Sequence, residues 1–159
     1  MQHIVLTGGP GAGKTTVLKI LANKGFSVGA DAARTIIQDR KRRGLTPRPE
    51  PAEFARQILR REQAAYGAID VSPLFYERGL VDAVGGMLGC GELNVTAARQ
   101  IIDAHPYQHV FIFPPWVQIY TTDAERDHTF DHAVGVYQST QHIYQHFGYA
   151  PIEVPEDTP

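Results

Sequence analysis

A glycine-rich turn lies between an apolar run and a helical pattern near the start of the chain. The stretch IVLTGGPGAGKTTVLKIL opens with residues typical of a buried strand and closes with apolar residues at helical spacing. Four glycines, a proline and a lysine separate the two parts. Glycine reaches backbone angles closed to other residues and leaves room beside its bare backbone. The stretch therefore predicts a tight turn built to surround a bound group.

The turn satisfies the pattern G-x-x-x-x-G-K-[ST], known as Walker A, through Gly8, Gly13, Lys14 and Thr15. In such a turn successive backbone N–H groups point inward, and the partly positive start of the following helix faces the same place. A polyphosphate is the ligand that this arrangement favours. The alternative, a glycine turn that merely precedes a helix, requires the full pattern to arise by chance.

The residues of this turn divide the work of binding a nucleotide. We expect Lys14 to reach the β- and γ-phosphates of ATP, and the Thr15 hydroxyl to bind Mg²⁺. Thr16 is expected at the α-phosphate. The predicted nucleotide-binding residues are Gly8, Gly9, Gly11, Ala12, Gly13, Lys14, Thr15 and Thr16.

Short β-rich runs alternate with helical segments along the whole chain. This alternation predicts a parallel sheet covered on both faces, which is a three-layer, doubly wound α/β fold with a five-stranded sheet. Nothing suggests a repeat or a second domain, so residues 1–159 are expected to form one nucleotide-binding domain. The expected strands are residues 3–7, 26–28, 72–76, 109–113 and, more weakly, 150–154.

Composition limits the expected cellular location of the protein and the classes of partner that it could bind. The net charge of −2 gives no indication of nucleic-acid binding. No apolar run approaches the roughly 18 residues that span a bilayer, so no membrane partner is expected. Cys90 is the single cysteine, which fits a reducing cytoplasm, and we expect it to be a small buried side chain. The oligomeric state leaves no mark in the sequence.

Charged residues follow the third expected strand, in the stretch FYERGLVDA. Ligands of open α/β sheets bind at the carboxyl ends of the strands, where Glu77 and Arg78 are expected. Glu77 is a candidate to hold Mg²⁺ or orient a substrate hydroxyl, and Arg78 to clamp an anion or the acceptor. An ion pair that caps the next helix is the structural alternative. Asp82 either ties Arg78 in place or is a plain surface carboxylate.

Asp31 follows the second expected strand and opens a helix, in the stretch SVGADAARTII. It is a candidate base that takes the proton from an attacking hydroxyl during phosphoryl transfer. Capping of the helix is its structural alternative. Arg34 lies one turn later and is a candidate for binding substrate, or for pairing with Asp31.

A charged segment after the fourth expected strand is interpreted as a lid, at about residues 116–132. Thr122 and Glu125 have the spacing of a capping box, and Arg126 follows them. Arg126 is a candidate to stabilise charge in the transition state of phosphoryl transfer. Its alternative is an ordinary surface ion pair. Trp116 is expected to be a packing anchor, with base stacking as the second interpretation.

The basic residues 40–43 have two interpretations. Cations near the end of a helix offset its dipole, and Gly44 is placed to terminate that helix. The second interpretation is a contribution to phosphate or acidic-partner binding. We favour the first.

Taken together, these segments resemble the P-loop family of nicotinamide riboside kinase-type domains and AAA-labelled ATPases. The matching stretches are TGGPGAGKTT, ADAAR, ERGLVDA, PPWVQIYTTDAERDHTFDHA and HFGYAPIEVP, so the resemblance runs from His3 to Pro155. The Glu77–Arg78 step is also similar to a segment of deoxynucleoside kinases. Two residues depart from the pattern of the P-loop family named above. Asp31 stands where that family more often has glutamate, and Glu77 stands where it usually has aspartate. The resemblance implies a kinase-type fold, use of Mg-ATP and a mobile lid.

Two functions fit these motifs. The first is an Mg-ATP-dependent kinase that phosphorylates the hydroxyl of a small metabolite, with a nucleoside as one candidate. The second is a regulatory protein that binds or hydrolyses ATP without such an acceptor. No guanine-reading N-K-x-D motif occurs, and no apolar strand ends in Asp-Glu, which argues against a GTPase switch and a motor ATPase. We favour the kinase.

Overall fold

The computed structural model describes residues 1–117 and 129–156. In this part of the chain five strands form one sheet in the order β2-β3-β1-β4-β5, and every neighbouring pair is parallel. The strands are β1 (His3–Gly8), β2 (Ser27–Val28), β3 (Leu74–Glu77), β4 (His109–Phe113) and β5 (Ile152–Glu153). The helices are α1 (Lys14–Asn23), α2 (Ala32–Arg42), α3 (Pro51–Ala65), α4 (Leu80–Gly89), α5 (Val95–Asp103) and α6 (Phe130–His146). The predicted α/β class and five-stranded parallel sheet are confirmed.

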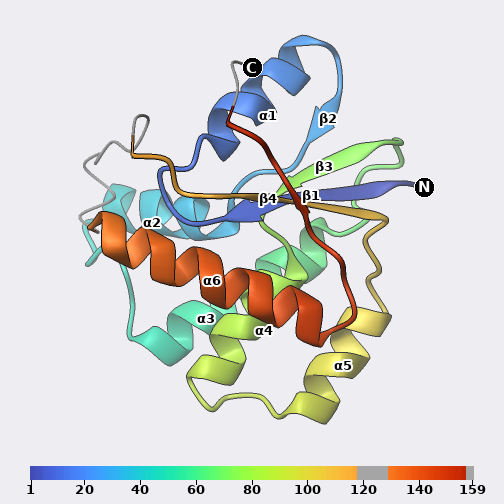
Figure 1. Cartoon of the computed structure of the whole chain (residues 1–159). Coiled ribbons are helices and arrows are strands. Elements are labelled where there is room, and N and C mark those ends of the chain that lie inside the picture. Colours follow the sequence, from blue (N-terminus) through green and yellow to red (C-terminus); the bar gives the residue numbers. More distant parts are fainter. Residues whose placement is uncertain (118–128, 157–159) are drawn as a thin grey trace.

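Both faces of the sheet are covered, as Figure 1 shows. Along β1 the side chains alternate, so Ile4 and Leu6 join the core on the α1 side. Val5 faces the opposite core, which is formed with residues of α3, α4, α5 and α6. Every residue of β1 is buried, which explains why its central residues Ile4, Val5 and Leu6 are all apolar and do not alternate with polar residues.

The ends of several helices follow from local chemistry. Asp31 caps α2, because its Oδ1 atom accepts a hydrogen bond from the Arg34 N–H at 2.9 Å. Arg40, Lys41 and Arg42 form the last turn of α2 and are followed by Gly44 at φ 68°. The helix-end interpretation of this basic run is therefore confirmed.

Two expectations about local structure differ from what is observed. Residues Tyr137–His146 have helical spacing and are helical, but α6 begins earlier, at Phe130, after the Thr129 side chain caps it. Its first turns pack tightly, with Ala133 fully buried, so a helical face exists before the expected start. Cys90 is exposed, because it lies at the end of α4, where the helix leaves the core. Among the helices of the described residues, none has the length and apolar character needed to cross a membrane.

The end of β1 leaves no room for a side chain. Gly8 pairs with Phe113 of β4 and has φ 128°. A Cβ atom at Gly8 would lie 2.4 Å from the Phe113 carbonyl oxygen. This close approach fixes where the glycine turn begins relative to β4.

We predict that Gly8→Ala lowers the free energy of unfolding more than Gly25→Ala does. Both glycines have positive φ, so each alanine is strained by about 1–2 kcal/mol. Only Gly8 adds a clash with backbone, since nothing lies within 4 Å of a Cβ at Gly25. Urea unfolding without nucleotide measures both values. Equal losses would contradict this account of the β1–β4 contact.

Candidate functional site

The glycine turn joins β1 to α1 and forms the floor of the candidate site. Gly11 and Gly13 have positive φ, and Gly13 directly precedes the first residue of α1. A Cβ at Gly9 would lie 2.6 Å from the Ala133 carbonyl oxygen. The turn therefore rests against α6, and its backbone starts the helix at Lys14 as predicted.

Lys14 is almost completely buried, with 3% of its surface exposed. Its Nζ atom donates hydrogen bonds to the Gly9 carbonyl at 2.7 Å and to the Gly8 carbonyl at 3.3 Å. The ammonium group is thus held over the turn that the sequence predicts for phosphate binding. Burial of a cation beside backbone carbonyls is unfavourable compared with contact to an anion, which makes this group suited to a phosphate ligand.

Thr15 and Glu77 meet although they lie 62 residues apart. The Thr15 Oγ1 atom donates a hydrogen bond to Glu77 Oε1 at 2.6 Å. Thr15 stands in the first turn of α1, and Glu77 ends β3 with 7% of its surface exposed. A hydroxyl and a carboxylate oxygen side by side are ligands that Mg²⁺ prefers. These residues therefore fit the magnesium site expected from the sequence.

Arg78 adopts a backbone angle that is rare for its residue type. Its φ is 64°, in the left-handed region, and it is the residue directly after β3. Such strain persists only where surrounding contacts enforce it, and it is common at binding sites. The Arg78 Nη1 atom lies 3.6 Å from Asp82 Oδ1. The predicted Arg78–Asp82 contact is present, and the side chain of Asp82 is only 10% exposed.

Asp82 links three elements around the site. Its Oδ1 atom accepts a hydrogen bond from the Thr7 hydroxyl at 2.6 Å. Its Oδ2 atom accepts from the Gly79 N–H at 3.0 Å and from the Tyr144 hydroxyl at 2.7 Å. Thr7 belongs to β1, Gly79 precedes α4 and Tyr144 belongs to α6. Sequence reasoning missed Thr7 and Tyr144, because no local pattern joins residues 75 and 62 positions from Asp82.

A cavity of about 480 Å³ opens beside the glycine turn. Lys14, Asp31, Arg34, Glu77, Arg78 and Asp82 line it. Apolar side chains from α2 and α3, among them Ile37, Phe54 and Ile58, form another part of its wall. The cavity therefore brings together all the described residues that the sequence analysis placed in catalysis or substrate binding.

Glu62 is a further carboxyl group in this cavity, and the sequence analysis missed it. It lies on α3 and is only 5% exposed. Burial raises the pKa of Glu62 to about 8, and the neighbouring Asp82 and Asp31 carboxylates act in the same direction. The sequence does contain a sign of this residue. Glu62 follows the buried Ala55 and Leu59 at helical spacing, at a position where an apolar residue is expected.

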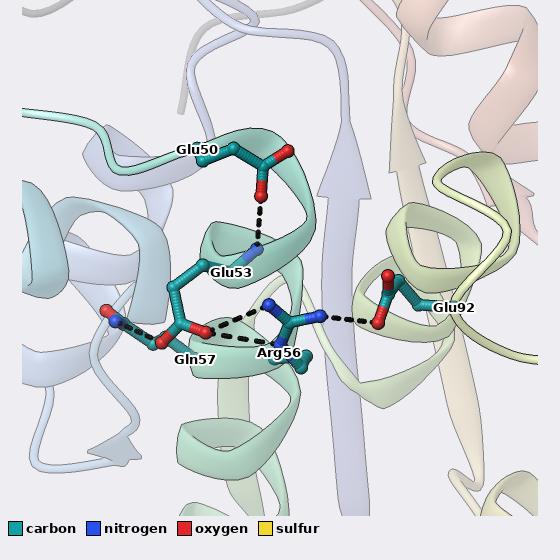
Figure 2. Close-up of polar contacts among 5 residues, drawn as sticks. All are labelled: Glu50, Glu53, Arg56, Gln57 and Glu92. Carbon is teal, nitrogen blue, oxygen red and sulfur yellow. Dashed lines mark hydrogen bonds and ion pairs between the residues drawn. The ribbon is translucent and has the colours of Figure 1, made fainter.

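Polar contacts join α3 to the turn after α4 (Figure 2). Arg56 Nη1 donates to Glu92 Oε2 at 2.5 Å, and Arg56 Nε donates to Glu53 Oε2 at 3.1 Å. Gln57 adds a bond to the same Glu53 carboxylate. Phe54 of α3 and Cys90 at the end of α4 both line the cavity. The Arg56 bridge thus joins two of its walls.

Some predicted residues cannot be placed. Arg126, Thr122 and Glu125 lie outside the described residues, as does most of the lid expected at about residues 116–132. Their roles stay predictions. Thr16 is exposed on the first turn of α1, and Ala12 is buried beneath the glycine turn.

Comparison with known proteins identifies the family. A family model described as an AAA domain matches residues 3–159. The chain therefore belongs to this family. No curated protein matches it.

Solved structures share the fold. A crystal structure of NadR protein in complex with NR has a TM-score of 0.69 at 14% identity, covering 92% of this chain and 43% of the NadR chain. Deoxyadenosine kinase from M. mycoides, with the products dCMP and dCDP bound, has a TM-score of 0.63 at 13% identity. That match covers 97% of this chain and 90% of the kinase. The predicted P-loop kinase fold is confirmed.

We predict that the stability of the protein falls as the pH rises from about 4.5 to about 8, through Glu62. In this range the folded state keeps a proton on Glu62 that the unfolded state releases, because the pKa of Glu62 is raised from 4.5 to about 8. The loss is at most about 1.4 kcal/mol per pH unit. Glu62→Gln should remove it, whereas Glu53→Gln, which alters an α3 carboxylate outside the cavity, should not. Urea unfolding across this range measures the slopes, and identical slopes for wild type and Glu62→Gln would refute the assignment.

Proposed function

We propose that the chain is an Mg-ATP-dependent phosphotransferase that phosphorylates the hydroxyl of a small metabolite, with nucleosides as the first candidates. The observation that carries this proposal is the cavity beside the glycine turn, which is lined by Lys14, Asp31 and Arg78. A protein that only hydrolyses ATP needs a place for water, whereas a kinase needs space for a second substrate. A cavity of about 480 Å³ has the size of a small-molecule site.

The residues of the turn would bind the triphosphate. Backbone N–H groups from Gly9 to Thr15 and the start of α1 would surround the phosphates, and Lys14 would move from the Gly8 and Gly9 carbonyls onto the terminal phosphate oxygens. Thr15 and Glu77 would hold Mg²⁺, which when bound neutralises charge on the β- and γ-phosphate oxygens. ATP and Mg²⁺ are thus the proposed co-substrate and cofactor.

Asp31 would act as the base at the acceptor. The acceptor hydroxyl oxygen forms a bond to the γ-phosphorus, the bond from that phosphorus to the β,γ-bridging oxygen breaks, and ADP leaves. The hydroxyl proton passes to Asp31, whose Oδ1 atom is held by the Arg34 N–H. Arg34 and Arg78 would bind the acceptor or the transferred phosphoryl group. Arg126 keeps its expected role as a lid arginine.

The similar structures supply the first acceptors to test. One structure holds NR and another is a deoxyadenosine kinase, so NR and deoxyadenosine lead a broader panel of nucleosides. With Mg-ATP we expect a phosphorylated product by mass spectrometry, and slow ATP hydrolysis without acceptor. Acceptor-independent hydrolysis, with no phosphorylated product across the panel, would favour the regulatory function.

We predict that Lys14→Ala abolishes ATP binding, because it removes the cation at the terminal phosphates. Isothermal titration with Mg-ATP measures this directly. Unchanged affinity would end the assignment of the glycine turn as the nucleotide site.

We predict that Asp31→Asn retains ATP binding and lowers turnover by roughly 10²–10⁴-fold, the usual contribution of a general base. Asparagine caps a helix about as well as aspartate, so the stability of α2 should be preserved. Comparison of the turnover number with the melting temperature separates the two roles. A normal turnover number would leave Asp31 as a helix cap alone.

A further inference from the structure

Glu62 is a buried acid on a helix face that packs against the core. Among the described residues it forms no ion pair within the distance that such pairs require, whereas the buried Glu77 and Asp82 are each bonded to hydroxyl groups. Glu62 occupies a position on the buried side of α3 where leucine would serve the core better. Residues that break such local rules without a compensating contact are concentrated at functional sites.

The surroundings of Glu62 place it at the inner part of the cavity. The Ala32 N–H, at the start of α2, lies near its carboxyl group, and the Asp31 and Asp82 carboxylates act on it as well. The Asp31 carboxylate caps the same helix start by accepting a hydrogen bond from the Arg34 N–H. Two carboxyl groups therefore lie at one helix start, near a third at Asp82. Groups of like charge so close together do not all ionise, and the most buried one keeps its proton.

Asp82 is less available to a ligand than Glu62 is. Both of its oxygen atoms accept hydrogen bonds from Thr7, Gly79 and Tyr144. The protonated carboxyl group of Glu62 has one O–H group that can donate a hydrogen bond. Glu62 lines the cavity together with the apolar Phe54 and Ile58. In these apolar surroundings one polar group decides which ligand atom is accepted.

We propose that Glu62 determines acceptor specificity, by donating a hydrogen bond from its carboxyl group to a lone pair of an uncharged acceptor. This inference rests on the proposed function, because it assigns the cavity to the phosphoryl acceptor. The acceptor class is a neutral molecule with a flat or apolar part against α3, and with a carbonyl oxygen or ring nitrogen facing Glu62.

Ionisation of Glu62 removes the donor and adds a negative charge to the cavity. At about pH 7 the group is protonated, and at about pH 9 only about one molecule in ten retains the proton, since its pKa is about 8. The dissociation constant of a neutral acceptor should therefore rise about tenfold between these pH values. The titratable groups that interact electrostatically with Glu62 are Asp31 before α2, Tyr76 on β3, Arg78 before α4, Asp82 on α4, Tyr107 before β4 and Tyr144 on α6. The charged groups of Lys14, Arg34, Arg48 and Glu77 line the same cavity.

These neighbours leave Glu62 as the group that responds in this pH range. Burial raises the pKa values of Tyr76, Tyr107 and Tyr144, so they stay neutral. Cys90 and His132 also line the cavity. All samples for the test therefore carry Cys90→Ser, and any effect of His132 appears equally in the Glu62→Gln variant.

The test measures binding of deoxyadenosine and deoxycytidine by calorimetry at about pH 7 and about pH 9, for wild type, Glu62→Gln, Glu62→Ala and the control Glu53→Gln. Wild type and Glu53→Gln should weaken about tenfold at the higher pH. Glu62→Gln keeps a donor, so its affinity should not depend on pH. Glu62→Ala should bind about tenfold more weakly at about pH 7, where it lacks the donor.

Each result decides between the inference and the proposed function. Binding that depends on Glu62 without any phosphorylated product supports the role of Glu62 in ligand recognition but contradicts the kinase. Phosphorylation with the same pH dependence in wild type and Glu62→Gln overturns the inference and leaves the kinase in place. Failure of both nucleosides to bind wild type at about pH 7 overturns the inference as well.

Discussion

The candidate site is held together by one largely buried carboxylate, Asp82. Its two oxygen atoms join the end of β1, the start of α4 and the last turn of α6 through Thr7, Gly79 and Tyr144. Hydrogen bonds to a buried charged group are stronger than those between neutral groups, and loss of one partner leaves the charge uncompensated. The contact to Arg78 adds the residue after β3 to this set. The position of the glycine turn, the left-handed Arg78 and the cavity wall all depend on this group.

The acidic groups around the cavity are divided by their contacts. Glu77 is bonded to Thr15 and Asp31 to the start of α2, and both line the cavity. Glu62 is buried, and burial favours its neutral form. One small space thus combines carboxyl groups suited to metal and proton chemistry with a neutral acid suited to recognition.

Much of this arrangement could be predicted from the sequence because parallel sheets gather their strand ends at one edge. That rule predicts that Lys14, Asp31, Glu77 and Arg78 lie close together, and all four line the cavity. Long-range contacts are harder to predict from the sequence, since no local pattern marks the hydrogen bonds of Thr7 and Tyr144 to Asp82. Glu62 could have been found from the apolar stripe of α3. The exposed Cys90 and the early start of α6 show that burial of a short segment depends on tertiary packing more than on residue type.

The contact of Gly9 with α6 also has a mechanical meaning. No side chain separates Gly9 from the Ala133 carbonyl. The backbone of the turn therefore lies directly against the backbone of α6. A shift of α6 would displace the turn by a similar amount, without slack to absorb it.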